Sequence, residues 1–108
     1  MPNSQFKSPA TLQSDGRIRV GGTQNVQPLA SGPEVKYHFI LVQGGTVAKG
    51  EGQGHGSTWT GLTEPNQPEL QLGPVLAVGV AVLAKGLPDP GLMTFSWSDQ
   101  IDLVSGPG

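Results

Sequence analysis

Apolar and polar side chains alternate with a period of two along much of this chain. The alternation is clearest in residues 35–43, 75–84 and 92–104, and shorter stretches with the same pattern are 17–20 and 57–62. Successive side chains of a β-strand point to opposite faces, so this period predicts strands. No stretch free of glycine and proline carries apolar residues at helical spacing. The pattern therefore predicts an all-β domain.

Glycine and proline separate the alternating stretches. The chain has 17 glycines and 10 prolines, and each is about twice as frequent as in an average protein. Because they fall between apolar runs, we interpret them as turns rather than as a sign of disorder. Three prolines make residues 64–74 a long crossover. Pro28 makes residues 23–30 an edge strand or an extended connection, since proline cannot donate to a ladder.

A hairpin is the strongest local prediction. Gly44-Gly45 fits a two-residue turn that needs a positive φ. Counting outward from that turn places Phe39 opposite Gly50, Tyr37 over Gly52 and His38 opposite Glu51. Aromatic rings then cover glycine backbone, an arrangement that stabilises sheets.

Two further strands carry specific expectations. Residues 75–84 are apolar on both faces, which predicts a central strand with something packed over each side. Residues 92–104 place Trp97 inward, with a kink or bulge at residues 98–100 before Ile101 and Leu103 resume the inward face.

The length of 108 residues fits one domain. Residues 1–15 are polar, with Phe6 and Leu12 as possible anchors, and are expected to form a flexible or docking N-terminal arm. The domain itself is expected over residues 16–104, and residues 105–108 form a C-terminal tail.

Four segments of the chain carry a resemblance to a known family: Gly16–Gly22, the Gly-Ser-Thr-Trp-Thr strand at 56–60, the valine-rich strand at 75–84 and Phe95-Ser-Trp97. In these segments the chain resembles the immunoglobulin-like modules of bacterial surface proteins and phage virions. The resemblance implies an immunoglobulin-like sandwich of about seven antiparallel strands. It also implies a spacer, a binding head or a capsid decoration rather than an enzyme. The cysteine pair of antibody domains is absent.

Composition and charge exclude several classes of function. Without cysteine there are no disulfides and no thiolate metal sites. The net charge is −2 and the basic residues are scattered, so the sequence predicts no nucleic-acid binding. The longest apolar run, residues 75–84, is too short for a membrane span. The first residues carry no apolar segment of a signal peptide.

Two groups of residues are considered as catalytic or metal sites. The His38–Glu51 pair could orient a general base in a small hydrolase with Ser57 as nucleophile, but an ordinary exposed cross-strand pair is favoured. A weak calcium site would need several carboxylates to converge, and the carboxylates available are Glu64, Glu69, Asp89, Asp99 and Asp102. The sequence therefore predicts no catalytic residues, no metal and no cofactor.

Five residues are candidate contacts for a partner: Phe6, His55, Trp59, Leu87 and Trp97. The two tryptophans are either core residues or binding-face aromatics, and His55 and Leu87 lie in expected loops. The sequence favours a non-catalytic structural or binding module with a protein partner or self-association, in a bacterial surface or phage virion assembly. The alternative is a protein- or carbohydrate-binding module of a larger secreted protein. Either role favours an extracellular or virion-surface location.

Overall fold

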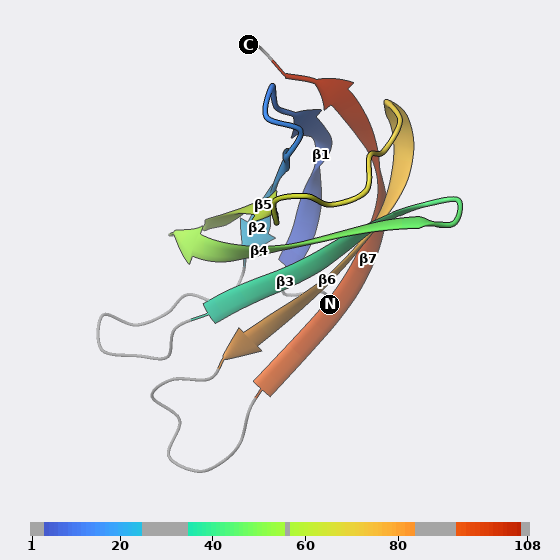
Figure 1. The fold of residues 1–108 in the computed structure, drawn as a ribbon. Helices are drawn as coiled ribbons and strands as arrows, with labels where there is room; N and C mark the ends of the chain where they lie inside the picture. Colours follow the sequence, from blue (N-terminus) through green and yellow to red (C-terminus); the bar gives the residue numbers. More distant parts are fainter. Residues whose placement is uncertain (1–3, 25–34, 56, 84–92, 107–108) are drawn as a thin grey trace.

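The computed structural model describes residues 4–24, 35–55, 57–83 and 93–106, and these form strands and turns with no helix (Figure 1). The seven strands are β1 (Ser4–Leu12), β2 (Ile18–Gln24), β3 (Val35–Gln43), β4 (Thr46–His55), β5 (Thr58–Thr63), β6 (Gly73–Leu83) and β7 (Met93–Ser105). The all-β prediction and the expected number of strands are confirmed.

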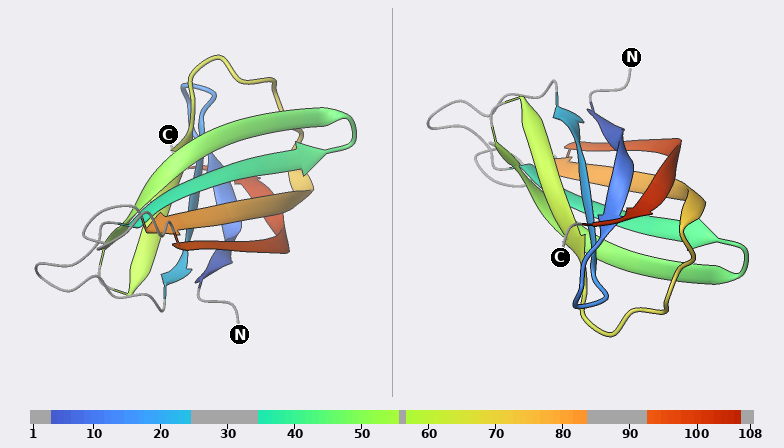
Figure 2. Two further views of the ribbon diagram at one scale, coloured as in Figure 1. Left: turned by 90° about the horizontal axis from the view of Figure 1, so that it is seen from below. Right: turned by 90° about the horizontal axis from the view of Figure 1, so that it is seen from above.

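The strands close into one barrel in the order β1-β2-β5-β4-β3-β6-β7 (Figure 2). Every neighbouring pair is antiparallel except β1 and β7, which are parallel. The expectation of two packed antiparallel sheets is corrected to a single closed sheet. The reason is β1, which pairs with β2 on one edge and with β7 on the other and so joins the two ends of the sheet.

Strand β1 occupies most of the segment that the sequence predicts to be an arm. Its residues Phe6 and Ala10 point into the barrel and are buried. Its pairing with β2 shifts register between Lys7 and Thr11. The polar composition of this segment reflects its outer face and this irregular stretch, not a position outside the domain.

The β3–β4 hairpin has the register that counting from the turn predicts. Phe39 pairs with Gly50, Tyr37 with Gly52 and His38 with Glu51. Gly44 has a φ of 59°, whereas Gly45 lies outside the left-handed region. A positive φ at the first central position only is the pattern of a type II′ turn.

The expected bulge at residues 98–100 is absent. β7 pairs with β6 without interruption from Gly73 opposite Leu103 to Leu83 opposite Met93. A constant period of two explains this, because Trp97, Ile101 and Leu103 already share one face without any shift. Asp99 simply occupies the same face.

The expected edge strand at residues 23–30 lies only partly within the described residues. Thr23 belongs to β2, which has β1 on one side and β5 on the other, so it is not at an edge. Residues 25–30 lie outside the described part of the chain.

The core fills the inside of the barrel. Its largest fully buried side chains are Trp59, Tyr37, Leu41, Leu103, Val20 and Thr63. Thr63 is satisfied there because its hydroxyl accepts a hydrogen bond from the amide of Ile18 at 2.8 Å. Leu70, from the connection between β5 and β6, joins the same cluster.

Candidate docking face

Three of the five predicted contact residues come together, but inside the barrel. Trp59 lies 5.3 Å from Phe6 and 6.0 Å from Trp97 between ring centroids. Tyr37 stacks on Trp59 at 4.7 Å with an angle of 5° between the planes. With Trp59 only 1% exposed, the aromatic cluster is part of the core and not a binding face.

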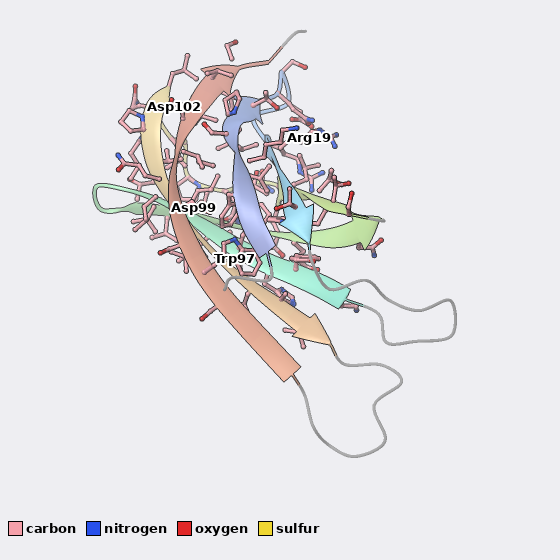
Figure 3. All side chains as sticks on the ribbon, turned by 180° about the vertical axis from the view of Figure 1, so that it is seen from behind. Arg19, Trp97, Asp99 and Asp102 are labelled. Atoms are coloured by element: carbon pink, nitrogen blue, oxygen red, sulfur yellow. The ribbon has the colours of Figure 1, made fainter. Side chains whose placement is uncertain are left out.

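Trp97 is the most accessible ring of this aromatic cluster. It lies on β7 beside β1 (Figure 3) and is partly buried against the core. Its indole Nε1 is buried and has no hydrogen-bond partner among the described residues. Buried polar atoms of this kind are uncommon. Trp97 thus keeps some surface, while Phe6 and Trp59 keep almost none.

The structure shows less about the other two predicted contact residues, His55 and Leu87. His55 ends β4, where its backbone pairs with Thr58. Leu87 lies outside the described residues, as does Asp89 of the possible calcium site. Within the described residues no three His, Asp or Glu side chains gather closely enough to hold a metal ion. Asp99 has a structural partner instead, because its Oδ2 accepts a hydrogen bond from the amide of Phe6 at 3.0 Å.

His38 and Glu51 face each other on the outside of the barrel and line a surface groove of about 390 Å³. The groove runs over three adjacent strands: β3, with His38, Phe39 and Ile40; β4, with Lys49, Gly50 and Glu51; and β6, with Val78 and Val80. Glu64, just after β5, closes one side. The groove is therefore built on the regular hairpin and its neighbour β6.

An apolar stripe continues from the groove along β6 and β3. Its outward-facing residues are Ile40, Val42, Val47, Leu76, Val78, Val80 and Val82. Ile40 is 36% exposed, Leu76 44% and Val47 46%. The expectation that β6 is covered on both faces is corrected here. Small inward residues such as Ala77, Gly79 and Ala81 pack on the core, but no described residue packs over the outer row.

Charged and hydroxyl groups border the stripe on opposite sides. On the β4 side, Lys49 Nζ lies 3.5 Å from Glu64 Oε2, and Glu51 follows two residues after Lys49. On the β7 side, the neighbours of Val78 and Val80 are Ser98 and Ser96. An apolar centre with a polar rim is the general anatomy of a protein interface.

The groove lacks one part of the hydrolase site that the sequence suggested. Its described lining holds a histidine and two glutamates but no serine, threonine or cysteine. Ser57, the nucleophile considered from the sequence, precedes β5 and does not line the groove. A base without a nucleophile or an oxyanion donor in reach does not make an acyl-transfer site.

A second, smaller hollow of about 210 Å³ lies over β1, β2 and β5. It carries the basic residues Lys7 and Arg19 together with Ser8, Thr11 and Thr60. Pro9 and Val20 also line it, so the two hollows differ mainly in charge: the first has mixed charge, and the second is basic and carries more hydroxyl groups.

The chain has no match among protein-family models, curated proteins or solved structures. Among the described residues, no helix is long and apolar enough to cross a membrane. The surface itself is therefore the only guide to function.

Sequence reasoning identified the His38–Glu51 pair but missed the stripe beside it. The signal is present, because Leu76, Val78, Val80 and Val82 form an apolar row on one face of a single strand. An apolar row usually faces inward, and this one does not. The opposite row of small residues is the better candidate for the inner face, because large rings from neighbouring strands need space there.

Proposed function

We propose that this chain is a non-catalytic docking module that contacts protein through the outer face of β3, β4 and β6. The observation that carries the proposal is the exposed apolar stripe on a barrel whose core is already filled. Contiguous exposed apolar surface bordered by polar residues is typical of interaction sites on soluble proteins. The role we propose is a structural subunit of a larger assembly, and the bacterial surface or virion setting comes from the resemblance alone.

The location of the exposed apolar residues supports the same proposal. Among the described residues, five large hydrophobic side chains are exposed, and three of them lie on this face: Ile40, Val47 and Leu76. Scattered surface hydrophobics need no explanation, but a gathering on one face does. The polar wall over β1, β2 and β5 shows no such gathering.

Photo-crosslinking in the cells that produce the protein tests the proposal. A photoreactive amino acid at Val80 is expected to yield a defined protein adduct, because Val80 lines the groove. The matched control is the same amino acid at Thr60, an exposed position on the polar wall. No adduct at Val80, or the same adducts at both positions, would overturn the docking face.

A further inference from the structure

We infer that the occupant of the docking face is a second copy of this chain, related by a two-fold axis that crosses the strands at right angles. This inference rests on the proposed function and adds the identity and orientation of the partner. It follows from the registers of four adjacent strands, β4, β3, β6 and β7. A two-fold interface must be self-complementary. If one residue of the first copy contacts a second residue of the other copy, the second residue of the first copy contacts the first residue of the other copy.

The strand registers place an inward-facing row at the centre of the face. Gly50, Phe39, Gly79 and Trp97 pair in that order across the four strands. None of them presents a side chain on the outer surface, because inward and outward positions alternate. The groove is centred on this row, since its lining includes Phe39, Gly50 and their neighbours on both sides. The proposed axis runs along this row.

The two rows that flank the centre complement each other. One row reads Lys49, Ile40, Val78, Ser98 and the other reads Glu51, His38, Val80, Ser96, in strand order β4, β3, β6, β7. A two-fold axis between the rows places each row over the other row of the second copy. Lys49 then meets Glu51, Ile40 meets His38, Val78 meets Val80, and Ser98 meets Ser96. Each of these contacts occurs twice.

The charged residues favour an axis across the strands over an axis parallel to the strands. With the axis parallel to the strands, β4 would lie over β7 of the second copy, and Lys49 and Glu51 would face Ser98 and Ser96. The valines would still pack, but the charges would lose their partners. Complementary charges fix register and orientation at interfaces, so the axis across the strands is favoured.

The area of the face indicates how tight the dimer is. Four strands at about 4.8 Å spacing and four outward rows at about 6.8 Å spacing give an area of at most about 500 Å² per copy, because the wall of a barrel curves. Stable interfaces bury about 800 Å² per partner. We therefore expect a weak dimer that forms at high concentration, or when copies are held near each other in an assembly.

Charge-reversal variants test the orientation without touching the core. Lys49 is 67% exposed through its side chain and Glu51 is exposed, so neither change is expected to affect folding. Sedimentation equilibrium from micromolar to millimolar concentrations should show wild-type dimerisation. Lys49→Glu and Glu51→Lys should each weaken association about tenfold or more, because each places like charges together twice.

Mixing the two single variants gives the decisive result. In the mixed dimer, the Lys49→Glu copy carries a carboxylate at both positions 49 and 51, and the Glu51→Lys copy carries an ammonium group at both. Each contact between these positions then joins opposite charges, so association should return to about the wild-type level. A mixture of Lys7→Glu with Glu51→Lys has the same two net charges, but its mixed dimer has one attractive and one repulsive contact, because Lys7 lies on the polar wall. In that control mixture the Lys7→Glu copies should pair with each other as in wild type, and the mixed dimer should be weaker than that of the two docking-face variants.

Glu64→Gln provides a variant expected to gain affinity. It removes the carboxylate that holds Lys49 within its own chain at 3.5 Å, which frees Lys49 for Glu51 of the second copy. Surface ion pairs are weak, so the expected gain is about two- to fivefold.

The outcomes separate this inference from the proposed function. A chain that stays monomeric at every concentration, or a dimer insensitive to both charge reversals, overturns the two-fold arrangement. If Val80 nevertheless crosslinks to a different protein, the docking face stands and only its occupant changes. If Val80 yields no adduct and the chain stays monomeric, both proposals fail.

Discussion

The wall formed by β3, β4, β6 and β7 is held together differently from the seam between β7 and β1. In the wall, backbone pairs continue without a register shift, for example from Val35 opposite Leu83 to Val42 opposite Leu76. At the seam, backbone pairing covers only Ala10, Thr11 and Leu12 of β1. Continuous backbone pairs therefore join the strands of the wall, whereas backbone pairs close only a short part of the seam.

Side chains replace the missing backbone pairs at the seam. The amide of Phe6 donates to Asp99 Oδ2 at 3.0 Å, and the amide of Asp102 donates to Ser8 Oγ at 3.1 Å. Asp99 and Asp102 lie along β7 next to β1 (Figure 3). Each bond supplies a partner to a main-chain group that has none from a ladder. Short polar side chains can thus join two strands where the sheet itself is irregular.

The largest expected loss of stability is in the wall, from a substitution at Gly50. A Cβ added there would lie 2.6 Å from the carbonyl oxygen of Leu62 and 2.8 Å from Cε1 of Phe39. Because the backbone oxygen cannot move aside cheaply, Gly50→Ala should lower the free energy of unfolding by about 3 kcal/mol. Urea unfolding measures the change.

Gly45→Ala is the matched control for Gly50. No atom lies within 4 Å of an added Cβ at Gly45, so its effect should stay within about 0.5 kcal/mol. Equal losses of stability in the two variants would show that close packing at Gly50 does not stabilise the wall.

A smaller loss of stability is expected at the seam from Asp99→Ala. The change leaves the Phe6 amide without its acceptor, which should cost about 2 kcal/mol and speed hydrogen exchange at that amide. The exposed neighbour Asp102 has an outward side chain, so Asp102→Ala should cost about 0.5 kcal/mol or less. Unchanged hydrogen exchange at the Phe6 amide in the Asp99→Ala variant would show that Asp99 does not help to close the barrel.

The smallest effect is expected from Ser8→Ala. It removes an exposed hydrogen bond to the amide of Asp102 and should cost about 1 kcal/mol or less. Exchange should accelerate at the Asp102 amide, whereas Ser96→Ala, on the outer face of the same strand, should leave that amide unchanged. If both variants behave alike, Ser8 plays no part in the seam.

Within the wall, the β3–β4 hairpin could be predicted from sequence because its information is local. Gly44-Gly45 sets the turn, and the period of two then determines every pair between β3 and β4. The continuous register of β6 with β7 follows the same alternation, although Asp99 on the inner face suggested a bulge. The reason for that carboxylate is the amide of Phe6, 93 residues away in the sequence, which no local pattern shows.

Neither the seam nor the docking face could be predicted, because both depend on contacts between distant parts of the chain. Strand order depends on which distant strands meet, and β1 was expected to be an arm because its segment is polar, with Phe6 and Leu12 as the only possible anchors. The stripe depends on which face of β6 turns inward. Both faces are apolar, so hydrophobicity alone does not distinguish them.

The joining of β1 to β7 also has a consequence for how the protein is made. Ribosomes release the chain from its N-terminus, so β1 emerges early while its partner strand is still unsynthesised. The pairs between β3 and β4 are local, so this hairpin can form as soon as it emerges, whereas non-local pairs form slowly. Until β7 has been translated, one edge of β1 stays open, and the nascent barrel is exposed to pairing with other chains.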